Sequence, residues 1–160
     1  MKRAVVGGIM LVLCGAVLYP LSLAAVTLIS TPPAVVGVGD LADCPSADTC
    51  VSSLATESEI YIAPIAYDGD MILAQTVLVQ TLASRPRTVV LESNDGYIYA
   101  EARTPILRFV DDLEFIFNPT RNQIDMRASS RVGTSDNGRN RRQLEAIRDE
   151  FTQNLRNTLR

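Results

Sequence analysis

The chain has 160 residues, which is enough for one domain once any targeting segment is set aside. Histidine is absent and Lys2 is the only lysine, so the folded part cannot hold a Ser-His-Asp or Cys-His nucleophile, a histidine-ligated zinc ion or a Ser-Lys dyad. The net charge of −3 combines an acidic stretch, residues 31–120, with a basic one, residues 121–160, which we expect to neutralise each other; the interspersed acids argue against a nucleic-acid partner.

The first 30 residues contain an apolar segment that predicts a single transmembrane helix. Ala4–Ile29 has no charged residue, and its 26 residues would span roughly 39 Å as a helix, against about 30 Å for the hydrocarbon core of a bilayer. Lys2 and Arg3 precede the segment, whereas acidic residues follow it. The positive-inside rule therefore predicts a single-pass membrane protein with a cytoplasmic N-terminus and a domain in the periplasm or a thylakoid-type lumen.

Alternatives for this segment remain open. Residues 22–24 read Ser-Leu-Ala, which fits the cleavage pattern of a signal peptidase, so the segment is either an uncleaved anchor or a signal peptide. The anchor is favoured because the apolar run continues to Ile29. Leu11–Cys14 superficially resembles a lipoprotein box, but Leu13 is too large for the position before the cysteine.

A linker and a pair of cysteines follow. Residues 31–43 contain two prolines and two glycines, which predicts an extended linker, and the domain then occupies residues 44–160. Cys44 and Cys50 stand six positions apart, and in an exported domain such a pair most simply forms a small-loop disulfide. A redox-active pair or a metal clip is the alternative, but neither a C-x-x-C motif nor a histidine supports it; we expect no metal and no cofactor.

The remaining patterns predict two helices and a hairpin. A helix is expected at Met71–Ser84, because apolar residues recur at helical spacing and Pro86 prevents continuation. Asn94–Gly96 separates two runs rich in β-branched and aromatic residues, which is typical of a hairpin turn. A second helix is expected near the C-terminus, beginning with a capping box formed by Asn140 and Gln143.

The strands complete the predicted fold. They are expected at Ile60–Ile65, Thr88–Ser93, Tyr97–Arg103, Arg108–Asn118 and Gln123–Ser130, the last four forming a meander. The fold class is therefore α+β, with an antiparallel sheet of about five strands packed against two helices and preceded by one transmembrane helix.

Alternation along the third strand of the meander divides its acids between two faces. Asp111 shares a face with aromatic residues, whereas Asp112 and Glu114 point the other way. In the last strand, Arg127 faces these two acids, and the simplest interpretation is a solvated ladder of cross-strand ion pairs. Asp111 needs a partner on its apolar face, either Arg131 or an arginine at the start of the last helix.

Three arginines, Arg139, Arg141 and Arg142, stand where the last helix begins. Cations at a helix N-terminus oppose the helix dipole by up to about 1 kcal/mol each, so a negative group should compensate. That group is either an acid of the same chain or an external anion such as phosphate, sulfate or a lipid headgroup, held by guanidinium groups and helix amides.

These patterns define the candidate site residues. Those expected to bind an anion or a partner are Arg127, Ser129, Arg131, Ser135, Arg139, Asn140 and Arg142. Their expected acidic partners are Asp111, Asp112, Glu114 and Asp136. Adjacent strand residues point to opposite faces, so Asp111 and Asp112 cannot form one catalytic pair.

Three segments of the chain resemble the family called domain of unknown function 1499. They are the cysteine segment Cys44–Ser53, the acidic run Arg108–Phe115 and the arginine-rich turn Arg127–Asn140. The resemblance covers most of Leu41–Arg148 and departs at residues 141–143. It implies no catalytic residues, because the family has no established activity, but it implies that the three segments belong to one unit.

The leading hypothesis is a membrane-tethered, extracytoplasmic and non-enzymatic domain. Through the arginine-rich turn it would bind a protein partner, a small anionic ligand or an anionic lipid. The first alternative is a carboxylate- or metal-dependent hydrolase that uses Asp111, Asp112, Glu114 or Asp136. The second is a structural component of an assembly.

Overall fold

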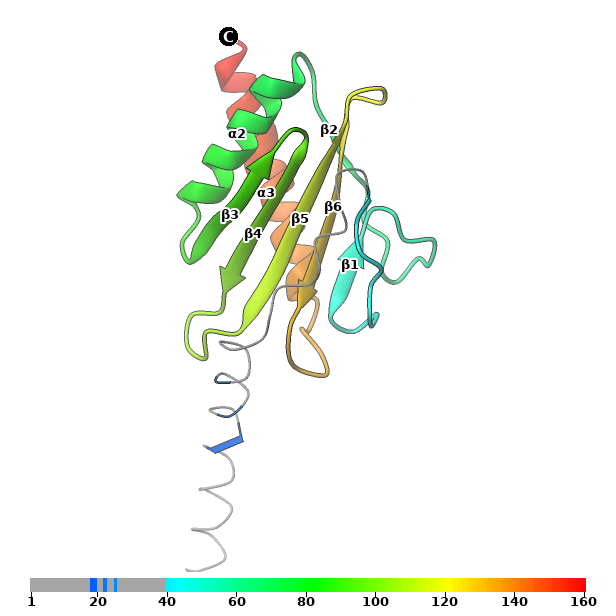
Figure 1. Cartoon of the computed structure of the whole chain (residues 1–160), viewed down its shortest axis with the longest axis vertical. Helices are drawn as coiled ribbons and strands as arrows, with labels where there is room; N and C mark the ends of the chain where they lie inside the picture. Colours follow the sequence, from blue (N-terminus) through cyan, green and yellow to red (C-terminus); the bar gives the residue numbers. More distant parts are fainter. Residues whose placement is uncertain (1–17, 20–21, 23–24, 26–39) are drawn as a thin grey trace, which may run out of the picture.

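The computed structural model describes residues 18, 19, 22, 25 and 40–160 (Figure 1). Most of the predicted transmembrane helix and most of the predicted linker lie outside the described residues, so both remain predictions. Within the described part, no helix has the length and apolar character needed to span a membrane.

Two helices and an antiparallel sheet make up the domain, which confirms the α+β class. The sheet has six strands in the order β1-β6-β5-β4-β3, with β2 also beside β6. In chain order the elements are β1 (Cys50–Ser52), β2 (Ile65–Ala66), α2 (Met71–Ser84), β3 (Thr88–Asn94), β4 (Tyr97–Arg103), β5 (Val110–Asn118), β6 (Gln123–Ser130) and α3 (Arg139–Thr158).

The observed sheet differs from the predicted one at its two shortest strands, β1 and β2. The predicted strand at Ile60–Ile65 is wrong over most of its length, since the ladder begins only at Ile65. Pro64, the residue before that point, has no N–H group to donate to a ladder. The additional strand, β1, has only three residues and pairs with β6 through Val51 and Ala128, a length too short for a sequence pattern to reveal.

Local signals account for the confirmed elements. Asp70 caps α2, because its Oδ1 accepts hydrogen bonds from the backbone amides of Ile72 at 2.6 Å and Leu73 at 3.1 Å. The β3–β4 hairpin turns at Gly96, whose φ of 79° suits glycine. β5 starts at Val110 instead of the predicted Arg108, because Arg108 has a φ of 59°, outside the strand region.

Both helices cover one face of the sheet, and the core lies between them and that face (Figure 1). The last helix buries one apolar stripe, whose members are Leu144, Ile147, Phe151 and Leu155. They pack with inward-facing strand residues, among them Leu113, Phe115 and Met126. Burial of these side chains at roughly 25 cal/mol per Å² of apolar surface is the main stabilising contribution to the domain.

The predicted capping box at the start of α3 is wrong. The N-cap residue is Gly138, which has no side chain, and Asn140 is completely buried inside the first turn. The Asn140 amide nitrogen instead donates to the carbonyl oxygen of Thr49 at 2.7 Å and to Ser130 Oγ at 3.0 Å. Asn140 therefore fastens α3 to the sheet.

The predicted disulfide between Cys44 and Cys50 is confirmed, with a Cα–Cα distance of 5.5 Å. It joins the segment before β1 to the sheet. Next to it, Leu41 is buried against Tyr97, Tyr99 and Ile116, which lie on the sheet face opposite the helices. Leu41 and Asp43 of the predicted linker thus contact the domain.

Candidate functional site

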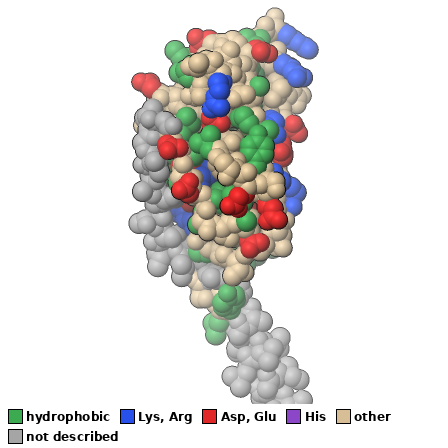
Figure 2. Space-filling view, turned by 90° about the vertical axis from the view of Figure 1, so that its right-hand side faces the viewer, with side chains coloured by type: hydrophobic (Ala, Val, Ile, Leu, Met, Phe, Trp, Pro, Cys, Tyr) green, Lys and Arg blue, Asp and Glu red, His purple; other side chains and the backbone are tan. Residues whose placement is uncertain are grey.

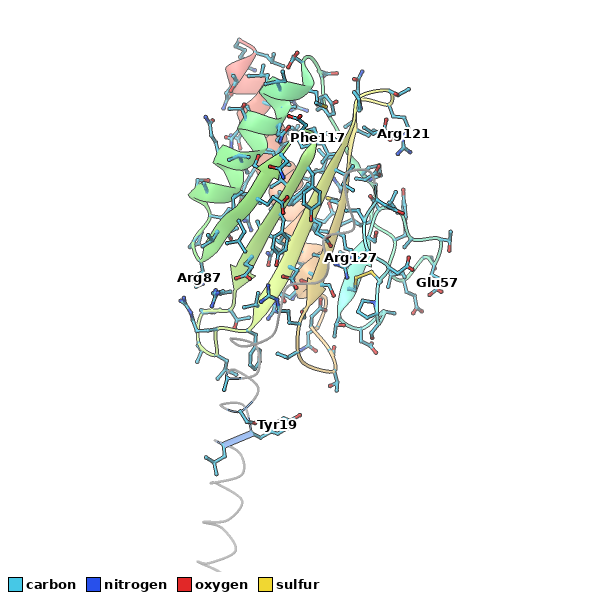
Figure 3. The ribbon with its side chains drawn as sticks, in the orientation of Figure 1. Tyr19, Glu57, Arg87, Phe117, Arg121 and Arg127 are labelled. Atoms are coloured by element: carbon cyan, nitrogen blue, oxygen red, sulfur yellow. A yellow bond between two sulfur atoms is a disulfide. The ribbon has the colours of Figure 1, made fainter. Side chains whose placement is uncertain are left out.

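The sheet face opposite the helices, called the outer face below, carries a network of charged side chains (Figure 3). Strand pairing places Glu114 opposite Arg127 and Asp112 opposite Glu101. Arg127 Nη1 lies 2.6 Å from Glu114 Oε2, so the ion pair expected from the alternation pattern is present.

This network is buried, whereas we expected a solvated face. Arg127, Asp112 and Glu114 are each at most 3% exposed. Leu41 packs on the same face, and the carbonyl oxygen of Asp43 accepts a hydrogen bond from Arg127 Nη2 at 3.3 Å. Because the segment before the disulfide covers the strands, these charges lie in a low-dielectric environment. Removing one partner of an ion pair in such an environment is strongly destabilising.

Arg131 is the centre of the network. Its Nε lies 3.1 and 3.0 Å from the two carboxylate oxygens of Asp112, and its Nη2 donates to Tyr99 Oη at 2.8 Å and forms an ion pair with Glu101. Burial lowers the pKa of Arg131, but Asp112 and Glu101 outweigh this effect and raise it. Tyr99 in turn donates to Asp112 Oδ1 at 2.6 Å, and burial raises the pKa of Tyr99.

A second network lies on the helix side of the sheet around Asp111. Arg139 binds both carboxylate oxygens of Asp111, through Nε at 2.9 Å and Nη2 at 2.5 Å. Ser130 Oγ donates to Asp111 Oδ1 at 2.6 Å. Of the two expected partners for Asp111, the arginine at the helix start is the one observed, since Arg131 lies on the outer face.

We expect the ionisation of Asp111 to reduce the stability of the domain as pH rises. Burial raises the pKa of Asp111 above its ordinary value of 3.8, and hydrogen bonds from Arg139 and Ser130 offset only part of this shift. The folded state therefore binds the proton more tightly than the unfolded chain, so this contribution is complete below about pH 3.8 and is lost as pH rises through the folded pKa. Relative to Asp111→Asn, the wild type should lose free energy of unfolding over this range in denaturant titrations. A wild type that instead gains stability relative to the variant would show that Arg139 outweighs burial.

Asp136 supplies the negative group at the start of α3. Its Oδ1 accepts from the backbone amide of Gly138 at 2.6 Å and its Oδ2 from that of Asn140 at 3.1 Å. Arg141 binds the carbonyl oxygens of Glu59 and Tyr61, each at 2.8 Å. Compensation by acids of the same chain, one of the two expected solutions, is therefore observed at this helix start.

The sheet separates the predicted site residues instead of joining them. On the outer face lie Arg127, Ser129 and Arg131. On the helix side lie Arg139 and Asn140. In the exposed chain around the start of α3 lie Ser135, whose Oγ accepts from the Asn137 amide, and Arg142, which donates to the Asn137 carbonyl oxygen. The seven residues therefore lie in three separate parts of the domain.

One pocket gathers arginines that the sequence keeps far apart, and it is called the arginine pocket below. Its volume is about 180 Å³, and it lies between the α2–β3 corner, the end of β4 and the first turn of α3. Its charged lining residues are Arg85, Arg87, Arg103, Asp111 and Arg139. Of this set only Arg139 and Asp111 were candidates from the sequence. The Arg-Pro-Arg run at residues 85–87 was the available signal, but it does not show that α3 lies beside it.

The arginines of this pocket differ in how they are paired. Arg139 is paired with Asp111, Arg85 with Glu150 at 2.5 Å, and Arg103 with Glu101 at 2.9 Å. Arg87 is exposed, and within residues 40–160 its guanidinium donates to a backbone carbonyl, that of Arg103 at 3.3 Å, and forms no ion pair. Arg87 thus has N–H donors available to a ligand in the pocket.

Acidic side chains gather elsewhere, on the face around β1 (Figure 2). A wider hollow of about 680 Å³ on this side is lined by Asp40, Asp43 and Glu57 together with the disulfide segment. Among the described residues, no group of three or more Asp, Glu, Cys or His side chains is arranged to hold a metal ion. The domain is therefore polarised, with acids around β1 and arginines around the pocket.

Fold and site together define a small disulfide-linked α+β domain with buried ion-pair networks on both faces of its sheet. The family model described as protein of unknown function (DUF1499) matches residues 40–151, and the chain belongs to this family. No curated protein and no solved structure matches the chain significantly. The matched range contains the disulfide, both networks and the arginine pocket.

Proposed function

We propose that the chain is a non-catalytic binding domain, tethered outside the cytoplasm by its N-terminal segment, that binds a small anionic group in the arginine pocket. The observation that carries this proposal is the convergence of four arginines from three separate parts of the fold on one opening. Guanidinium groups hold phosphate and carboxylate oxygens through paired hydrogen bonds, so such a convergence favours an anion.

The size of the pocket narrows the class of ligand. Pockets for drug-sized molecules enclose about 300–1,000 Å³, whereas the arginine pocket encloses about 180 Å³. This volume suits a phosphate, a sulfate or a single carboxylate-bearing group. A larger molecule would place only its anionic part here, and the rest would extend into solvent or along the adjoining surface.

The carboxylates support binding over hydrolysis. Asp111, Asp112 and Glu114 each form an ion pair with an arginine, and Asp136 accepts two backbone amides. Carboxylates engaged in this way are held in fixed positions, which suits a structural role. A general acid or base needs instead an unengaged group beside the substrate.

The tether rests on the amino-acid sequence. The uncharged run Ala4–Ile29 is long enough to cross a bilayer, and Lys2 and Arg3 precede it. A disulfide within the domain is also typical of an oxidising compartment, because thiols are kept reduced in most cytoplasms. Both features favour a domain held on the periplasmic or lumenal side of a membrane.

Inorganic phosphate should raise the thermal stability of the full chain, and Arg87→Gln should abolish this response. Arg87 is the pocket arginine without an ion pair in the described domain, so its replacement removes donors while leaving the Arg139–Asp111 pair intact. A ligand that binds only the folded state stabilises it by about 2.7 kcal/mol at a hundred times its dissociation constant. The measurement is the Tm of purified protein in detergent at constant ionic strength, with and without phosphate.

Arg121→Gln is the matched control, because Arg121 lies in the β5–β6 turn at the opposite end of the sheet (Figure 3). It should leave the phosphate response unchanged. An equal response in wild type and Arg87→Gln would refute the anion pocket, and sulfate in place of phosphate would test whether the response follows tetrahedral oxyanions in general.

A further inference from the structure

An apolar loop tip lies at the same end of the domain as the arginine pocket. The β4–β5 loop, residues 104–109, reaches this end together with the α2–β3 corner and the β6–α3 loop (Figure 1). Ile106 in this loop is 86% exposed, the highest value among the exposed large hydrophobic side chains of the described residues. A single exposed isoleucine is common in soluble domains, so its meaning depends on what surrounds it.

The loop holds Ile106 outward by a defined geometry. The Thr104 amide donates to the carbonyl oxygen of Phe109 at 2.9 Å, and the Phe109 amide donates back to Thr104 Oγ1 at 2.9 Å. These two bonds close the loop at its base. The exposure of Ile106 therefore results from a hydrogen-bonded turn and not from an unpaired chain segment.

Two arginines at this end occupy a backbone conformation that does not favour arginine. Arg87 and Arg108 have φ values of 61° and 59°, in the left-handed region that glycine and asparagine adopt most readily. Among the described residues, the other non-glycine positions with positive φ are Asn122 and Asn137, and asparagine suits this conformation. Arginine does not favour this backbone conformation, so the presence of arginine at both positions indicates a functional role for the two side chains.

We propose that this end of the domain docks on an anionic membrane surface. Ile106 enters the boundary between headgroups and acyl chains, while Arg87 and Arg108 contact lipid phosphates. Apolar side chains flanked by cations are the pattern that binds anionic interfaces, because burial and charge attraction act together. The surface is distinct from the acidic side around β1, which an anionic membrane would repel.

The membrane is within reach of this surface, a step that rests on the tether of the proposed function. Eleven residues separate Ile29 from Leu41, the buried residue beside the disulfide, and fully extended they reach about 40 Å at most. Tyr19, from the apolar segment, lies beyond the end of the domain that carries the β4–β5 loop (Figure 3). A tether of this length allows contact between the loop and the bilayer.

A tryptophan at position 106 would report this contact directly, because the chain contains no tryptophan. We expect the full-length Ile106→Trp variant, reconstituted in vesicles that contain phosphatidylglycerol, to show blue-shifted emission and quenching by brominated acyl chains. In vesicles of phosphatidylcholine alone, both signals should weaken. Adding Arg108→Gly should weaken them in the anionic vesicles as well, and the fold should tolerate this change because glycine readily adopts the φ of 59°.

Ile72→Trp is the matched control, since Ile72 is 70% exposed at the start of α2, at the other end of the domain (Figure 1). Its emission should stay that of a solvent-exposed indole in both vesicles. If the Ile106→Trp reporter in anionic vesicles matches this control, the membrane surface is refuted and the exposed tip is left to a protein partner. If Arg108→Gly leaves quenching unchanged, the role of that arginine is refuted.

The tests of the tether and of the pocket remain separable from this one. Flotation of the full chain with phosphatidylcholine vesicles reports the tether, and the phosphate-dependent Tm reports the pocket, which Arg108 does not line. If the chain floats with the vesicles but the Ile106→Trp reporter is not quenched, the docking surface is refuted and the tether is supported. If added anionic vesicles quench the reporter but the chain does not float with phosphatidylcholine vesicles, the docking surface is supported and the tether is refuted.

Discussion

Arg131→Met is expected to lower the free energy of unfolding by about 3–5 kcal/mol, because it leaves the buried carboxylate of Asp112 without a cation. The Arg131 side chain is 8% exposed and binds Asp112 and Glu101, whose side chains are 4% and 10% exposed. Methionine retains much of the length and apolar area of arginine, so the loss reports charge and hydrogen bonding more than volume. Denaturant titration followed by far-ultraviolet circular dichroism would measure it.

Arg148→Met is the control for an ion pair near the surface. Arg148 pairs with Glu145, whose side chain is 45% exposed and can be hydrated when the arginine is removed. Such pairs contribute about 0–1 kcal/mol. Adding Asp112→Asn to Arg131→Met should recover part of the loss, since it removes the unpaired charge. Equal effects of Arg131→Met and Arg148→Met would contradict the view that the outer face is a desolvated network.

The elements predicted from the sequence are those whose signals are local. The helix α2 is bounded by Asp70 before it and by Pro86 after it, and Gly96 marks the hairpin turn. Alternation along β5 and β6 placed Glu114 opposite Arg127, because strand residues alternate between faces whatever lies above them.

The features that the sequence did not predict depend on distant contacts. Burial of the outer face arises from Leu41 and the segment tied down by the disulfide, and no pattern within β5 or β6 reports it. The arginine pocket forms where the α2–β3 corner meets the start of α3, more than fifty positions later in the chain. The left-handed backbone conformation of Arg87 could not be predicted from the sequence either, because this conformation is typical of glycine and not of arginine.

Replacing both Cys44 and Cys50 by serine is expected to lower the free energy of unfolding by about 2–3 kcal/mol. In the chain-entropy model, a disulfide that closes a short loop stabilises by this amount, because it restricts the unfolded chain. A second effect follows from position, since the bond holds the chain that covers Arg127 through the Asp43 carbonyl oxygen. We therefore expect faster amide hydrogen exchange in β6 for the variant, which an effect confined to the unfolded state would not produce.

The same cysteines test the compartment. The chain has three cysteines, the third being Cys14 in the apolar segment. If cells are quenched in acid and the protein is then unfolded and treated with a mass-adding maleimide, an exported domain on an uncleaved anchor should gain one label. Loss of the segment by cleavage after residue 24 would leave no labelled cysteine, whereas a cytoplasmic domain with reduced thiols would gain three labels. Three labels would remove the basis of the extracytoplasmic tether, because the disulfide would then be absent in the cell.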